Sequence, residues 1–153
     1  MEEFKRILVV SRMTKECREA IHQGVSLVRR FGGELTILHV VYNPFGLKGW
    51  SLPTVSLEQD LNRIFEEAKK DLDRIIAKEK ANGLQIKELI RKGDPTEEIF
   101  RAVKEEKIDL LIMLAHEEWR LEHFLFGRSN EEIVRKMPCS VLLVKKEPEP
   151  VKW

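Results

Sequence analysis

The sequence predicts an α/β domain in which a largely parallel, five-stranded sheet is sandwiched between helices. Five short apolar runs alternate with stretches of helical periodicity. The runs are nearly continuous in apolar residues, which is typical of strands buried on both faces. The 153 residues, 42% of them hydrophobic, provide core for one domain and too little for two. We therefore assign residues 1–146 to a single domain and residues 147–153 to a charged C-terminal tail.

The predicted strands are rich in Val, Ile and Leu, and a helical segment separates each strand from the next. Parallel strands connected in this way are joined by right-handed crossovers. The predicted strands are Arg6–Ser11, Glu34–Val41, Gln85–Arg91, Leu110–Ala115 and Ser140–Lys145.

The first two helices are predicted from apolar residues spaced by three and four positions. The first runs from Cys17 to Phe31, and Gly32–Gly33 ends it. The second is the longest and ends near Asn82–Gly83. One face of each helix should pack on the sheet, and in the second helix that face consists of Leu61, Ile64, Phe65, Ala68, Leu72, Ile75 and Ile76.

The third and fourth helices are predicted from their capping residues. Asp94 can cap free amides, Pro95 fits the first helical turn, and Glu97 occupies the capping-box position. A Ser-x-x-Glu box over Ser129–Glu132 opens the fourth helix, which closes before Met137–Pro138.

Composition argues against several classes of partner. Lys plus Arg (27) nearly balance Asp plus Glu (26), so net charge attracts neither nucleic acid nor an anionic membrane. The start, MEEFKRILVV, is acidic where a signal peptide is basic, and no apolar run spans a bilayer. We therefore expect a soluble, cytoplasmic protein. Cys17 and Cys139 have neither metal-ligand nor disulfide spacing, and we expect reduced thiols.

Four segments together resemble the universal stress protein (UspA-like) family, over Lys5 to Lys146. They are KRILVV, LTILHVV, KGDPTEEIFRAVKEEKIDLLIM and PCSVLLVKK, in that order and spacing. The resemblance implies an adenine-nucleotide-alpha-hydrolase-like sheet of order 3-2-1-4-5. Members are typically small cytoplasmic homodimers, many pairing through the last strand, and only some bind ATP. It therefore implies a homodimer with contacts at Val141, Leu142, Leu143 and Val144, and an apolar edge strand would in any case need covering.

The implied strand order also places a ligand site between the carboxyl ends of strands one and four, where the order reverses. Val40, near the end of the second strand, would face the base of a bound nucleotide by the same resemblance. The residues at the reversal are Ser11, Arg12 and Met13 on one side and Leu114, Ala115 and His116 on the other.

ATP-binding members carry the motif G-x-x-G, nine residues, then G-S or G-T before the last helix. The aligned positions here are Leu114, Glu117, Gly127 and Arg128, so one glycine of three remains. Glycines let the backbone approach phosphate. A Glu117 carboxylate about 4 Å from a phosphate oxygen would cost about 4 kcal/mol at an effective dielectric of about 20, or roughly a thousandfold in affinity. That cost disappears if Glu117 turns to solvent or pairs with Arg120.

Two main interpretations of this pocket remain open, with ATP bound in the family's usual way as a third. In the first, the loop from His116 to Phe126 fills the reversal point with apolar side chains, and no nucleotide binds. In the second, arginine side chains help to hold an anion or an altered nucleotide by charge-assisted hydrogen bonds. One of them, Arg12, stands where ATP-binding members of the family usually have an Asp. The candidate residues are Arg12, Val40, His116, Arg120, Gly127, Arg128 and Ser129, the last three at a helix start that suits an anion.

Enzymatic chemistry finds no support in the sequence. No Ser, Cys or Thr has a recognisable catalytic partner, and neither a Walker loop nor G-x-G-x-x-G is present. His116, His123, Glu118 and Glu122 match no known metal-ligand spacing, so we expect no metal. His39 is expected to be a hydrogen-bonded core or rim residue.

The connector Tyr42–Ser56 carries more apolar surface than an ordinary solvated loop, and we expect a lid or a dimer contact there. Together these features predict a non-catalytic, dimeric stress-response or regulatory protein with a degenerate ATP loop and no bound cofactor. The alternative is a nucleotide- or anion-responsive switch with its ligand at the ends of strands one and four. An unidentified protein partner fits either prediction.

Overall fold

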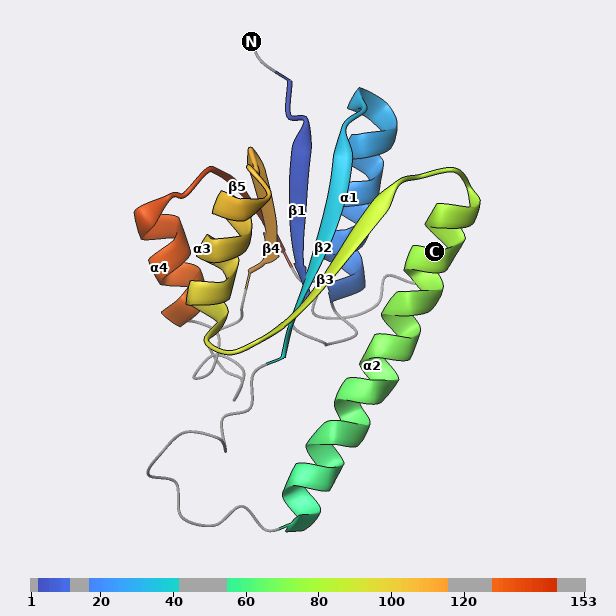
Figure 1. Cartoon of the computed structure of the whole chain (residues 1–153), viewed down its shortest axis with the longest axis vertical. Coiled ribbons are helices and arrows are strands. Elements are labelled where there is room, and N and C mark those ends of the chain that lie inside the picture. The colour runs from blue at the N-terminus through green and yellow to red at the C-terminus, as the bar shows by residue number, and fades with distance from the viewer. Residues whose placement is uncertain (1–2, 12–16, 42–54, 116–127, 146–153) are drawn as a thin grey trace.

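The computed structural model describes residues 3–11, 17–41, 55–115 and 128–145 (Figure 1). Five parallel strands form one sheet in the order β3-β2-β1-β4-β5. The predicted fold class and strand order are therefore confirmed. The elements are β1 (Arg6–Ser11), α1 (Cys17–Phe31), β2 (Glu34–Val41), α2 (Val55–Ala81), β3 (Ile86–Lys92), α3 (Pro95–Glu105), β4 (Leu110–Leu114), α4 (Arg128–Lys136) and β5 (Ser140–Val144).

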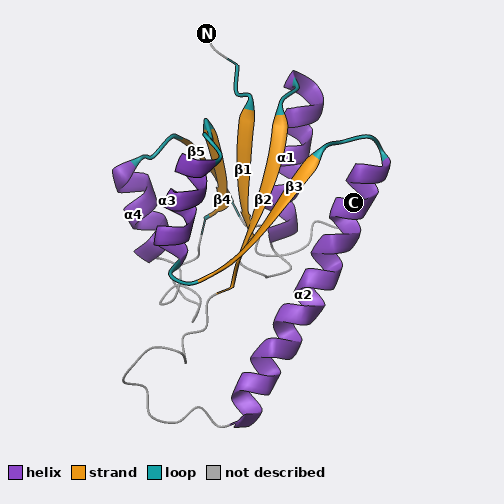
Figure 2. Cartoon of the chain, in the orientation of Figure 1, coloured by secondary structure: helices purple, strands orange, loops and turns teal. Residues whose placement is uncertain are grey.

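The sheet has one apolar core on each face, because consecutive side chains of a strand point to opposite faces. On one face Val9 and Ile112 pack with α1 and α2; on the other, Leu8 and Leu111 pack with α3 and α4. Figure 2 shows helices on both sides of the strands. Strands covered in this way explain the nearly continuous apolar runs in the sequence.

Capping determines where α3 begins. The Asp94 carboxylate accepts a hydrogen bond from the Glu97 backbone N–H at 3.0 Å, and Pro95 occupies the first turn. This start is the one predicted. Helix α4 begins at Arg128, so Ser129 already lies within the helix. The prediction that Ser129 caps this helix is therefore wrong.

Helix α2 begins earlier than the sequence pattern indicated. Val55 and Ser56 are helical, so the predicted connector over residues 42–56 is too long by these two residues. Its 27 residues give a helix about 40 Å long, against about 23 Å for the seven-residue strand β3. Leu72 and Ile76, in its C-terminal part, pack in the core, and its start extends beyond the carboxyl ends of the strands (Figure 1). The side chains of Leu61, Ile64, Phe65 and Ala68, predicted on the same face, lie outside the described residues.

Ion pairs join elements at the rims of the fold. The buried Glu79 of α2 pairs with Arg29 of α1, and Arg91 of β3 lies 3.6 Å from the buried carboxylate of Glu98 in α3. The hydrogen bond that Arg91 donates to the Glu105 carboxylate, with further attraction from Glu98 and Glu105, raises the pKa of Arg91. No helix in the described ranges is long and apolar enough to cross a membrane.

Candidate functional site

The carboxyl edge of the sheet contains the reversal point that the sequence predicted. Strand β1 pairs with β2 on one side and with β4 on the other, and all three run in the same direction. The helices that follow these strands, α1 and α4, pack on opposite faces of the sheet, so the ends of β1 and β4 mark the place where such sheets bind ligands. Ser11 ends β1 with a buried side chain, and Leu114 ends β4.

The start of α4 is tied directly to this edge. The Asn130 side-chain amide donates a hydrogen bond to the Leu114 carbonyl oxygen at 2.8 Å. One residue further on, the Ala115 backbone N–H donates to the Val144 carbonyl oxygen at 2.8 Å. The bond from Asn130 holds the first turn of α4 at the end of β4, and the bond from Ala115 continues the pairing of β4 with β5. Because the first backbone amides of a helix have no intrahelical partner, this turn presents donors and a partial positive charge at the carboxyl edge.

Leu114, aligned with the first glycine of the family motif, is part of the core. Its side chain is 9% exposed and belongs to the apolar cluster beneath α1 and α2. Its backbone continues β4 and pairs in register with Val144. The position that would need a glycine's freedom at a phosphate is therefore a regular strand residue here.

Most of the predicted ligand-binding residues cannot be compared with the structure. Arg12, His116 and Gly127 lie outside the described residues, as do Glu117 and the proposed metal-site residues. Arg128 and Ser129 form the start of α4, and only their backbone is described. Whether the arginines converge on one site therefore stays a prediction.

Val40 is described in full and lies beside this edge. Its side chain is 1% exposed and packs in the core cluster with Leu38 and Ile99 beneath α3 and α4. Contact between Val40 and a base also stays a prediction.

His39 is the described residue at this edge whose environment the sequence did not reveal. Its side chain is fully buried, and neither ring nitrogen makes a hydrogen bond, so the predicted hydrogen-bonded histidine is wrong. The closest carboxylate oxygen, on Glu88, is 3.6 Å from Nε2. Burial, with repulsion from Lys69, lowers the pKa of His39 more than Glu88 and Asp73 raise it. The imidazole is therefore neutral at neutral pH.

The described residues offer neither an activated nucleophile nor a metal cluster. Within the described ranges, no group of three or more His, Cys, Asp or Glu residues could hold a metal ion. Neither Cys17 nor Cys139 forms a disulfide, and burial raises the pKa of the Cys139 thiol. A raised pKa favours the unreactive thiol over the thiolate nucleophile.

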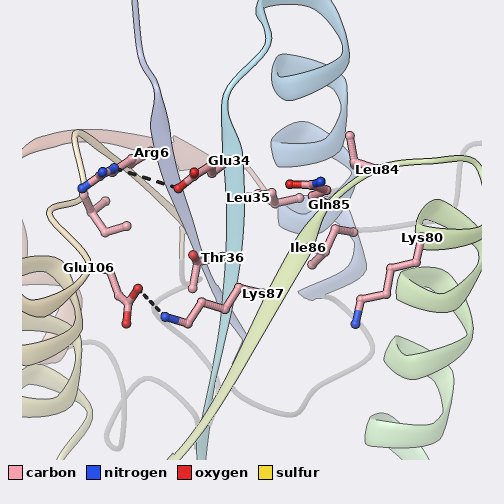
Figure 3. A pocket seen from close by; sticks show the side chains of 11 residues that line it. Arg6, Glu34, Leu35, Thr36, Lys80, Leu84, Gln85, Ile86, Lys87 and Glu106 are labelled. Atoms are coloured by element: carbon pink, nitrogen blue, oxygen red, sulfur yellow. Dashed lines mark hydrogen bonds and ion pairs between the residues drawn. The ribbon is translucent and has the colours of Figure 1, made fainter.

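A polar groove of about 520 Å³ lies at the amino ends of β1, β2 and β3 (Figure 3). Its cations already have carboxylate partners. Lys87 pairs with Glu106 at 2.6 Å and Arg6 with Glu34 at 3.9 Å. The groove is therefore largely neutralised by its own side chains, and it lies at the edge opposite the carboxyl ends, where such sheets bind ligands.

Comparison with known proteins places this fold in one family. The universal stress protein family matches residues 3–145. Universal stress protein MJ0577 of Methanocaldococcus jannaschii is 26% identical, over 94% of this chain and 96% of its own length. Universal stress protein E of Escherichia coli K12 is also 26% identical, over 98% of this chain and 48% of its own length.

Solved structures agree with this assignment. The structure of MJ0577 has a TM-score of 0.69 at 26% identity and covers 97% of this chain and 100% of its own. A universal stress protein in complex with cAMP has a TM-score of 0.63 at 17% identity, with 95% and 100% covered. A family protein from Arabidopsis thaliana with AMP bound has a TM-score of 0.62 at 16% identity, with 94% and 93% covered. The last two show a shared fold, and the family match over residues 3–145 shows that the chain belongs to the universal stress protein family.

Proposed function

We propose that this universal stress protein is a non-catalytic homodimer in stress response or its regulation, and that it binds ATP more weakly than members with an intact glycine loop. The observation that carries the proposal is the end of β4. Leu114 stands where the motif has its first glycine, and its side chain is committed to the core. Leucine there prevents the close backbone approach that glycine allows.

Charge around the loop supports weak ATP binding. Glu117 stands where the family motif has its second glycine, so the sequence has a carboxylate where the motif has no side chain. Like charges about 4 Å apart repel by about 4 kcal/mol at an effective dielectric of about 20. The Glu117→Gly variant should therefore bind ATP more tightly, by up to roughly a thousandfold.

The exposed edge of β5 supports a homodimer. Leu142 is 37% exposed and Leu143 is 44% exposed, on an edge strand of the sheet. Because the Val144 carbonyl faces β4, the alternate residues Val141 and Leu143 turn their backbone groups to the free edge. An antiparallel pair of β5 strands would match Val141 with Leu143 of the second copy and satisfy these groups.

Thermal unfolding with ATP, ADP, AMP or phosphate tests the proposal. A ligand at a hundred times its dissociation constant stabilises the folded state by about 2.7 kcal/mol. We expect no shift with millimolar ATP for the natural sequence and a clear shift for Glu117→Gly. A strong shift of the natural protein with ATP would contradict weak binding, and measurable ATP turnover would contradict the non-catalytic role.

A second candidate function is a nucleotide- or anion-responsive switch. It is favoured by the hydrogen bond from Asn130 to Leu114, which holds the start of α4 at the carboxyl edge, where helix amides suit an anion. Relatives of the same fold have AMP or cAMP bound. The switch predicts slower hydrogen exchange of residues 116–127 with phosphate or AMP, lost in Arg12→Ala/Arg128→Ala. Unchanged exchange with every phosphate ligand would leave the first function.

A further inference from the structure

An apolar groove lies beside β5 on the side of the sheet that α1 covers. Its volume is about 670 Å³. Three large side chains around it are unusually exposed for their type: Phe4 at 43%, Phe31 at 53% and Leu142 at 37%. Leu27 of α1 and Leu110 of β4 complete its apolar lining. Neighbouring exposed aromatic and aliphatic side chains of this kind mark a surface that another chain covers.

The groove is open because β5 is the last strand of the sheet. Helix α1 packs against Val9 of β1 and Ile112 of β4, and it ends at Phe31. The amino-terminal half of β5 therefore has a neighbouring strand on one side only and no helix lying fully across this face. The groove reaches the free edge of β5, since Val141, whose backbone groups face that edge, also lines the groove.

We propose that this groove receives the C-terminal tail of a second copy of the chain, with Val151 and Trp153 as the apolar anchors. The inference rests on the β5 homodimer proposed above and names a second contact within it. Residues 146–153 lie outside the described part of the chain. Their sequence, KEPEPVKW, is polar except for these two side chains and the prolines.

The direction of the strands selects the second copy's tail over the chain's own. When Val141 pairs with Leu143 of the second copy, Ser140 lies opposite Val144 of that copy, and Ser140 lines the groove. The tail that follows enters at the groove. The chain's own tail follows the other end of β5, about 13 Å from Ser140, and β5 runs away from the groove toward that end. Eight extended residues reach up to about 27 Å, enough to span the groove from the second copy.

The chemistry of the tail fits a side-chain contact. A tryptophan that binds in such a groove buries about 150–250 Å² of its surface. The groove volume of about 670 Å³ leaves room for one or two anchoring side chains. Pro148 and Pro150 donate no backbone hydrogen bond and favour an extended chain, so the tail fits the groove better than it would extend the sheet. Lys152 alternates with the two anchors and would point out toward the rim, where Glu3 lies.

Fluorine NMR on the full-length protein labelled with 5-fluorotryptophan tests the contact. The Trp153 resonance is assigned by its absence in Trp153→Phe, and its shift between H2O and D2O reports exposure to solvent. We expect a small solvent shift in the natural dimer and a large one in Phe31→Lys, which places a charge in the groove. Val134→Lys, at a 39% exposed apolar position on α4, is the matched control and should leave Trp153 protected.

Mixing two variants tests which chain supplies the tail. Phe31→Lys has a blocked groove and an intact, labelled tail; Val151→Ala/Trp153→Ala has an intact groove and a silenced tail. After subunit exchange, the labelled tail should regain protection in the mixed dimer. Protection that Phe31→Lys removes and mixing does not restore would mean that each chain binds its own tail, which overturns the assignment.

Sedimentation velocity on the same samples separates failure of this inference from failure of the proposed dimer. A monomer would overturn both. A dimer in which Trp153 is fully exposed and insensitive to Phe31→Lys would overturn the tail contact and leave the β5 dimer standing.

Discussion

Asp109 shows how one side chain connects the starts of two strands. It precedes β4, and its carboxylate accepts hydrogen bonds from the backbone N–H groups of Lys5, at 2.8 Å, and Arg6, at 3.0 Å. Its own backbone N–H donates to the Arg6 carbonyl oxygen at 3.0 Å. The Asp109 side chain thus extends the contact between β1 and β4 by bonds that lie before Ile7 and Leu110, the first residue pair of the two strands.

Replacing Asp109 by alanine should lower the free energy of unfolding by about 1–3 kcal/mol, because two backbone donors lose a charged acceptor. Urea unfolding at neutral pH measures the loss. Asp109→Asn keeps one acceptor oxygen and should lose less. Equal stability of Asp109→Ala and the natural protein would show that water replaces the carboxylate without cost.

His39 makes stability depend on pH. Burial lowers its pKa in the folded state below the ordinary value of 6.5, so the unfolded chain takes up a proton at a higher pH than the folded one. Stability from this residue is therefore full above pH 6.5 and falls as the pH drops toward the folded pKa. The charged groups that face it are Lys69, Asp73 and Glu88.

Urea unfolding between pH 8 and pH 5 tests this dependence. Destabilisation on acidification should be smaller in His39→Gln than in the natural protein, because that variant has no imidazole to protonate. Only the change in unfolding free energy with pH is compared, so a loss of stability that is the same at every pH does not affect the result. Parallel curves for the two proteins would show that His39 does not contribute.

At the scale of elements, close packing of α1 on the sheet depends on a small residue. A Cβ added to Gly24 would lie 2.6 Å from the Val9 Cγ2 atom and 3.0 Å from the Leu35 Cδ1 atom. Gly24 therefore lets the helix approach β1 and β2 closely. Periodicity predicted the buried face of α1, but its distance from the sheet depends on facing side chains from other elements.

Gly24→Ala should destabilise the fold although alanine favours helix by about 1 kcal/mol. Overpacking costs about 1–3 kcal/mol, which equals or exceeds that gain. Thermal unfolding measures the difference. Gln23→Ala, one position away on the exposed side of α1, is the matched control and should be neutral or slightly stabilising. A higher melting temperature for Gly24→Ala would mean that Val9 moves aside at little cost.

The hydrogen bond from Asn130 should stabilise the first turn of α4. Asn130→Ala removes the hydrogen bond to the Leu114 carbonyl oxygen and should cost about 0.5–1.5 kcal/mol. Hydrogen exchange should become faster at the first turn of α4, while the exchange of α3 stays unchanged. Exchange rates in α4 equal to those of the natural protein would show that the helix start is held by other contacts.

At the scale of the whole molecule, the two edges of the sheet differ. Strand β3 carries Lys87, Glu88 and Arg91, each in an ion pair, and charged edges resist pairing with other chains. Strand β3 also exposes Ile90 among these charges, whereas β5 presents two consecutive leucines, Leu142 and Leu143. Pairing through β5 is therefore the favoured route to a dimer.

Leu143→Lys should convert the dimer to a monomer without unfolding it, because this side chain is 44% exposed in the isolated chain. Sedimentation velocity measures the oligomeric state, and circular dichroism confirms folding. Val144 would be a poor test, because its 9% exposed side chain belongs to the core. A Leu143→Lys dimer as stable as the natural one would place the interface elsewhere.

Local patterns determined much of this fold. Apolar runs identified the five strands, apolar spacing identified α1 and α2, and capping residues identified α3 and α4. Asp94, Pro95 and Glu97 located the start of α3, since caps and periodicity involve neighbours in sequence. Strand order came from resemblance to a family, because pairing of β1 with β4 joins residues about a hundred positions apart. No local pattern specifies such a contact.

The sequence by itself determined the fold class and the family. Only the tertiary structure decided the rest: the unsatisfied imidazole of His39, the bond from Asn130 to β4 and the open groove beside β5. The physical reason is common to all three. Burial, hydrogen-bond partners and exposed apolar surface depend on which elements meet in space, and those elements are distant in the chain.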